Sequence, residues 1–126
     1  MGLDMYLHGR VKKIEREEHE GYPIDSIHVQ LAYWRKHWNL HGFIVKNFAE
    51  NGDDCNPVYL LPGDIEKILR AIKDDALPHT KGFLFGTSDK SEAQRAEDVA
   101  VFEGALAWLK AEKPGEERLL FYRASW

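Results

Sequence analysis

Apolar and polar residues alternate along short stretches of the chain, which predicts β-strands. Residues 3–8 place three apolar side chains on one face and Asp4, Tyr6 and His8 on the other. Further short stretches predicted as strands are residues 27–31, 58–61, 82–86 and 118–126. The charged stretch 11–23 indicates that the first strand ends in an exposed loop.

Apolar side chains spaced three and four residues apart predict three helices. The first, residues 32–50, has two neighbouring stripes: Trp34, Trp38, His41, Val45 and Phe48, and beside them Tyr33, His37, Leu40 and Ile44. The second, residues 62–76, begins with a proline in its first turn, where a proline is well accepted. The third spans residues 89–112.

Strands and helices that alternate in this way favour one sheet with helices packed on it. We therefore expect an α+β or α/β fold, built as two layers from a short-stranded sheet and about three helices. The chain has 126 residues, of which 44% are hydrophobic, and this size suits one core. We expect residues 1–126 to form a single globular domain.

The charge and cysteine content narrow the classes of function. The formal net charge is −4, and the sequence lacks the basic stripe that is typical of nucleic-acid-binding domains. Nucleic acid is therefore not the expected partner, although the charge leaves a local basic patch open. Cys55 is the single cysteine, which fits a reducing cytosol, and no apolar run is long enough to suggest a membrane span. We expect a cytoplasmic protein.

Two patterns raise the question of a metal or nucleophilic site. His37 and His41 lie four residues apart, a spacing that can hold zinc on a helix when a third ligand joins them. No CxxC pair accompanies them, so two histidines at the edge of the core are the simpler interpretation. Cys55 follows Asp53 and Asp54, and two adjacent carboxylates disfavour the thiolate that nucleophilic catalysis needs. We expect neither a metal nor another cofactor.

Several motifs together resemble a family of small proteins encoded in bacteriophage and prophage genomes. They are MGLDMYL at the start, AYWRK followed by Leu40, His41 and Phe43, DDC before a tyrosine-containing strand, GFLFG, and a closing FY…SW. The resemblance covers nearly the whole chain. It implies the cytosol of a host cell and an accessory role, in which the protein binds a host protein or a small ligand.

The polar and aromatic residues within these motifs form the candidate binding set: Asp4, Tyr33, Trp34, Arg35, Lys36, His41, Asp54 and Trp126. Such a mixed set either locks a core through a polar network or lines a binding site. Arg35 and Lys36, next to tryptophans, suit an anion or a nucleobase, or else form a solvated helix edge. The position of His41 relative to Arg35 and Asp4 separates these interpretations.

Three functions follow as hypotheses. The first is a binding protein without catalysis of its own. The second is a small enzyme with His41 as general base, Asp4 or Asp54 as its orienting carboxylate and Arg35 as an anion clamp. The third is a structural component that associates with itself. The sequence leaves the oligomeric state open.

Overall fold

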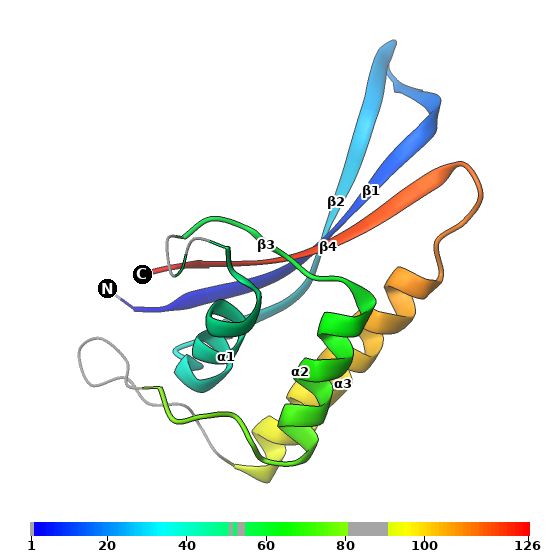
Figure 1. The fold of residues 1–126 in the computed structure, drawn as a ribbon. Coiled ribbons are helices and arrows are strands. Elements are labelled where there is room, and N and C mark those ends of the chain that lie inside the picture. The colour runs from blue at the N-terminus through cyan, green and yellow to red at the C-terminus, as the bar shows by residue number, and fades with distance from the viewer. Residues whose placement is uncertain (1, 51, 53–54, 81–90) are drawn as a thin grey trace.

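The structure, a computed structural model, describes residues 2–50, 52, 55–80 and 91–126, without the side chains of residues 14–16. Its strands are β1 (Asp4–His19), β2 (Tyr22–Arg35), β3 (Val58–Tyr59) and β4 (Glu116–Ser125), and its helices are α1 (Trp38–Phe48), α2 (Pro62–Lys73) and α3 (Glu92–Lys110). The strands form one antiparallel sheet in the order β2-β1-β4-β3 (Figure 1). The expected α+β class is confirmed.

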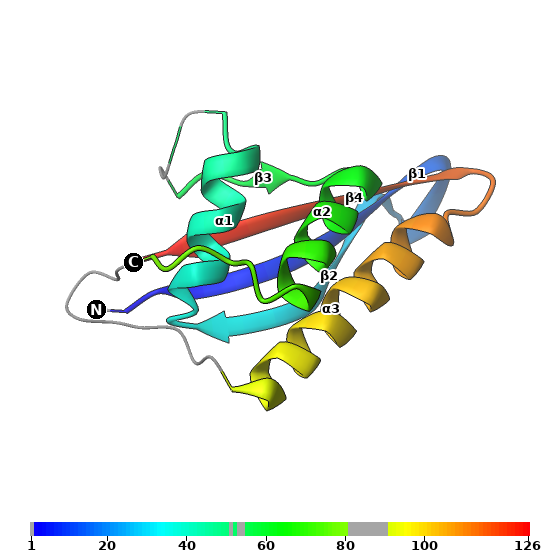
Figure 2. The same cartoon turned by 60° about the horizontal axis from the view of Figure 1, so that its bottom comes forward.

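The three helices pack on one face of this sheet, and no other described helix or loop covers the opposite face (Figure 2). Burial along β1 follows this division, because Met5 and Leu7 are fully buried whereas the alternating residues Tyr6 and His8 are partly exposed. We call the uncovered side the open face. From the strand registers, its residues are Asp4, Tyr6, His8, Arg10 and Lys12 of β1, Ser26, His28, Gln30, Tyr33 and Arg35 of β2, Tyr59 of β3, and Glu117, Leu119, Phe121, Arg123 and Ser125 of β4.

The core lies between the sheet and the helices. Its buried members come from every layer: Leu3, Met5, Leu7, Leu120, Tyr122 and Ala124 from the sheet side, Leu40 and Ile44 from α1, Ile65, Ile68 and Ile72 from α2, and Phe102 and Ala105 from α3. Ile65, Ile68 and Ile72 of α2 and Phe102 and Ala105 of α3 thus belong to the buried core. None of the helices in the described ranges is both long and apolar enough to cross a membrane.

The single helix predicted over residues 32–50 is wrong in its first part. Residues 32–35 complete β2, where Trp34 pairs with Met5. Lys36 then adopts a left-handed backbone with φ of 58°, which no α-helix tolerates, and its N–H donates to the carbonyl of Leu3 at 2.8 Å. The helix begins only at Trp38, yet both indoles are buried, as predicted.

The expected loop at 11–23 is also wrong, because these residues extend two long strands. β1 has 16 residues and β2 has 14, so these two strands are longer than expected, whereas β3 has two residues. Glu20 and Gly21 both have positive φ, which suits a tight two-residue hairpin turn. The resulting hairpin projects beyond the helices (Figure 1).

The other predicted elements agree with the structure apart from their ends. The helix predicted over 62–76 spans 62–73, and the helix predicted over 89–112 spans 92–110. The Ser91 side chain caps the latter by accepting a hydrogen bond from the Gln94 backbone at 3.1 Å. The strand predicted over 82–86 lies outside the described residues.

Candidate functional site

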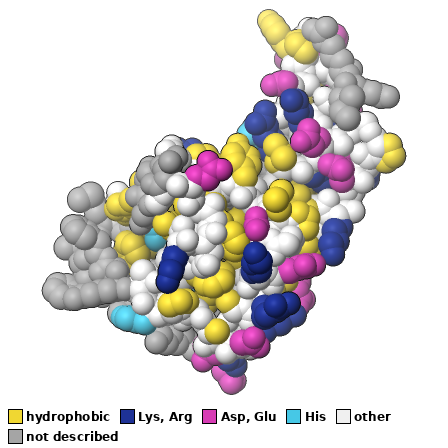
Figure 3. Space-filling model, in the orientation of Figure 1, with side chains coloured by type: hydrophobic (Ala, Val, Ile, Leu, Met, Phe, Trp, Pro, Cys, Tyr) yellow, Lys and Arg dark blue, Asp and Glu magenta, His cyan; other side chains and the backbone are white. Residues whose placement is uncertain are grey.

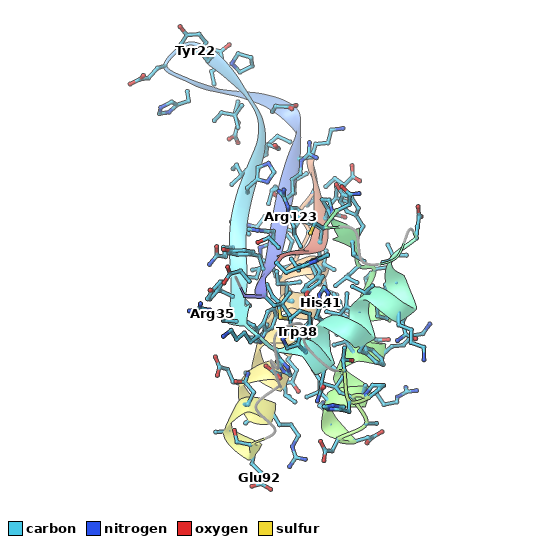
Figure 4. All side chains as sticks on the ribbon, turned by 90° about the vertical axis from the view of Figure 1, so that its left-hand side faces the viewer. Tyr22, Arg35, Trp38, His41, Glu92 and Arg123 are labelled. Carbon is cyan, nitrogen blue, oxygen red and sulfur yellow. The ribbon has the colours of Figure 1, made fainter. Side chains whose placement is uncertain are left out.

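The sheet divides the predicted binding set into two groups. Asp4, Tyr33 and Arg35 lie on the open face, whereas Trp34, His41 and Trp126 lie on the helix side, and Lys36 forms the turn between β2 and α1. Asp54 lies outside the described residues. Figure 4 shows Arg35 on the outer side of the sheet and His41 on the side of α1.

This division bears on the enzyme hypothesis. His41 has the sheet between itself and the open face, so Asp4 and Arg35 do not share a concave surface with it. The version with Asp54 as orienting carboxylate concerns a residue that the structure does not describe. Among the described residues, His41 and the predicted acid Asp4 and clamp Arg35 therefore lie on opposite sides of the sheet.

On the helix side, Asp98 of α3 joins α1 to β2. Its Oδ1 accepts from Trp34 Nε1 at 2.9 Å and from Gln94 Nε2 at 2.8 Å. Its Oδ2 lies 2.6 Å from His37 Nε2, and since a carboxylate oxygen accepts, this histidine nitrogen is the donor. Asp98 is 2% exposed. A buried carboxylate that accepts three hydrogen bonds is well suited to lock a core.

A cavity of about 130 Å³ lies beside this network. Its polar lining is provided by His37, Asn39, Asp75, Ser91, Arg95 and Asp98. A histidine held by a carboxylate is also the arrangement of a general base, so this cavity is where the helix side can support catalysis. The hydrophobic pattern did not single out Asp98, although this residue precedes Phe102 by four positions and therefore lies on the same side of α3.

The second buried histidine pairs with the sheet. His41 Nδ1 lies 2.6 Å from the Tyr122 hydroxyl, and its ring centroid is 5.7 Å from that of Trp126. A cavity of about 10 Å³ lies beside these residues and Cys55, which is about the volume for one water molecule. The His41 region therefore suits core packing better than ligand binding. In the described part of the chain, no three His, Cys, Asp or Glu side chains gather as metal ligands would.

On the open face, five rings form a continuous aromatic row across all four strands. In order they are Tyr33, Tyr6, His8, Phe121 and Tyr59, and the centroids of successive rings are 5.2, 5.6, 5.2 and 5.7 Å apart. These spacings lie within the range of stacked and tilted ring pairs. The row presents ring surfaces to solvent, since Tyr33 and Tyr59 at its ends are 47% and 55% exposed.

A bulge in β2 helps to keep this row on one face. The β1–β2 register shifts between Leu7, which pairs with Ala32, and His8, which pairs with Gln30. The extra residue is Leu31, so Gln30 and Tyr33, three positions apart, both lie on the same face as Tyr6 and His8. The sequence could not show this shift, because periodicity alone does not place bulges.

Cations surround the aromatic row. Arg10, Lys12, Arg35 and Arg123 lie on the open face with the carboxylates Asp4 and Glu117. Among the residues that the structure describes, none of these four cations forms an ion pair, whereas the arginines at 95 and 118 do. The face visible in Figure 3, which carries α1 and α2, instead has acidic and basic side chains interspersed.

Two pKa shifts report on the charge of the open face. Burial lowers the pKa of His8, and the positive charges of His28 and Arg123 lower it further, against an opposing backbone hydrogen bond at Val29. The hydrogen bond that the Tyr33 hydroxyl donates to Asp4 Oδ1 at 2.6 Å raises the pKa of Tyr33. Asp4 is thus already engaged by Tyr33, and Arg123 places a positive charge near His8.

The sequence alone predicts only some of the residues that share the open face. The alternation of apolar and polar residues over 3–8 predicts that Tyr6 and His8 lie on the same face as Asp4. Phe121 and Arg123 join them only because β4 pairs with β1.

Compared with protein-family profiles, with curated proteins and with solved structures, the chain matches none.

Proposed function

We propose that this protein is a phage- or prophage-type accessory protein that acts by binding a partner through its open face. The observation that carries the proposal is the aromatic row together with cations that form no ion pair with any residue in the described part of the chain. Tyrosine, phenylalanine and arginine are residues that binding surfaces favour, because they offer large rigid contact areas and charged hydrogen bonds.

Binding explains the open face better than catalysis does. The predicted general base His41 lies behind the sheet, and the open-face acid Asp4 is hydrogen-bonded to Tyr33. An uncovered sheet also leaves the rings exposed to water, whereas a catalytic site usually excludes it. This surface provides contact area and charge, which are sufficient for binding.

The experiment is affinity capture from host lysate with quantification of bound proteins, nucleic acids and small molecules. The double variant Tyr33→Ala/Arg123→Ala alters two exposed open-face residues. Arg70→Ala, which alters an exposed arginine on α2, is the matched control. We expect the captured material to be lost from the double variant and kept by the control. Equal capture by both variants, or no capture by the unaltered protein, would overturn the proposal.

A second candidate function is a small enzyme centred on His37. The observation in its favour is the 2.6 Å contact between His37 Nε2 and Asp98 Oδ2 beside a cavity of about 130 Å³. Turnover of nucleotides or esters that is abolished in His37→Gln, with the fold intact by circular dichroism, would favour this enzyme over the binding proposal.

A further inference from the structure

We infer that the open face binds single-stranded nucleic acid, with bases stacked on the aromatic row and phosphates held by Arg10, Arg35 and Arg123. This inference rests on the proposed function and names the class of partner. It concerns residues from both ends of the chain, which only the sheet brings together.

The first argument is the geometry of the rings. Single-stranded nucleic acids bind to platforms on which successive bases stack against aromatic side chains, and a four-stranded sheet is a known support for such rings. Here the rings run from β2 to β3 without a gap larger than 5.7 Å between centroids. The partly exposed Tyr6, His8 and Phe121 lie in the middle of the row, where a base can cover them.

The second argument is charge. The chain as a whole carries −4, but the open face has four cations and two carboxylates, of which Asp4 already accepts from Tyr33. Among the described residues, Arg10, Arg35 and Arg123 of this face form no ion pair, and guanidinium groups in this state are well suited to phosphate oxygens. This face therefore complements a polyanion, although the chain as a whole is acidic.

The third argument separates single strands from other polyanions. In a duplex the faces of the bases are covered by their neighbours, so the aromatic row would have no base to stack on. An acidic protein would satisfy the arginines but offers no series of flat rings to match five aromatic side chains. A single strand supplies both an unstacked base and a phosphate at each nucleotide.

The experiment measures fluorescence anisotropy of a labelled mixed-sequence oligonucleotide of about 12 nucleotides, as DNA and as RNA. The matching duplex and an oligoglutamate peptide are the competing ligands. We expect single strands to bind, and Phe121→Leu to weaken binding about tenfold by removing one stacking ring while keeping an apolar side chain. Arg123→Gln should weaken binding and reduce the slope of log affinity against log salt by about 0.7. Arg70→Ala should change neither.

Each alternative outcome has a defined meaning. The inference is wrong if single strands do not bind, or if the open-face variants, shown by thermal unfolding to be folded, bind them as the unaltered protein does. If oligoglutamate binds instead with the same losses in the variants, the partner is an acidic protein and the proposed function stands. The proposed function fails as well if neither ligand binds and the open-face variants capture the same material from lysate as the unaltered protein does.

Discussion

At the scale of single residues, Asp98 shows how one buried carboxylate can join three elements. Its oxygens hold Trp34 of β2, His37 before α1, and Gln94 one turn earlier on α3. The sequence predicted that Trp34 faces inward and that His37 sits at the edge of the core, and both are buried. It did not predict their shared partner, because the contact spans more than 60 positions and periodicity describes one element at a time.

We expect Asp98→Asn to lower the free energy of unfolding by about 1–3 kcal/mol. An amide group in place of the carboxylate turns one acceptor into a donor, so one of the three donors loses its partner inside the core. Chemical denaturation with urea measures this difference. The matched control is Glu97→Gln, the neighbouring exposed position, which should stay within about 0.5 kcal/mol. Equal free energies of unfolding for the two variants would show that the Asp98 carboxylate does not stabilise the core.

His8 allows the charge of the open face to be measured directly. Because the positive charge of Arg123 helps to lower the pKa of His8, we expect Arg123→Gln to raise that pKa towards its ordinary value, as followed by NMR of the imidazole. A histidine whose folded pKa is lowered favours the neutral form, so its contribution to stability is present above the unfolded pKa and declines as the pH falls below about 6.5. Arg70→Gln is the control. A fall in the His8 pKa in Arg123→Gln would contradict an electropositive face.

At the scale of elements, the error at residues 32–35 has a clear physical origin. Trp34 and Trp38 are four positions apart, and a spacing of four places two residues on one side both in a helix and in a strand. The pattern therefore predicted correctly that both indoles are buried and could not show that the backbone changes between them. The change occurs at Lys36, which has a positive φ, and the hydrophobic pattern does not indicate this backbone conformation.

The packing of α3 on β1 depends on one glycine. A Cβ at Gly9 would lie 2.6 Å from Cη2 of Trp108, whose backbone carbonyl accepts a hydrogen bond from Arg118. We expect Gly9→Ala to lower the free energy of unfolding by about 1–3 kcal/mol because it overpacks this contact. Thermal or urea unfolding measures the change.

A glycine within α3 is the control for this prediction. Gly104 lies within α3, and a Cβ there would meet nothing within 4 Å. Gly104→Ala should therefore raise the free energy of unfolding by about 0.5–1 kcal/mol, since alanine restricts the unfolded chain and favours the helix. If both substitutions stabilise the protein, the contact between Gly9 and Trp108 is not close.

At the scale of the whole molecule, the sequence predicted the class and the two layers but not the strand order. The order β2-β1-β4-β3 brings the first and last strands together, a pairing between chain ends that no local pattern specifies. The open face depends on this pairing, since β1 contributes Tyr6 and His8 and β4 contributes Phe121 and Arg123. The expected absence of a basic stripe was accurate for the linear sequence, and the local patch arises only in the folded sheet.

The hairpin of β1 and β2 extends beyond the helices, as Figure 4 shows with Tyr22 at its tip. Tyr22 is 76% exposed, and a two-stranded ribbon without a covering layer is marginally stable. We therefore expect backbone amides of residues 17–24 to exchange hydrogen much faster than those of residues 4–11, which pair with strands on both sides. Hydrogen exchange followed by mass spectrometry measures the difference.

The same measurement tests whether the protein associates with itself through this hairpin. Protection at residues 17–24 that disappears on dilution would mean that another copy covers the tip, as the hypothesis of a self-associating component requires. Protection that persists at every concentration would contradict the expected weakness of the ribbon. Rapid exchange at every concentration, with slow exchange at residues 4–11, would mean that one copy of the chain holds the strands of the open face together without a partner at the tip.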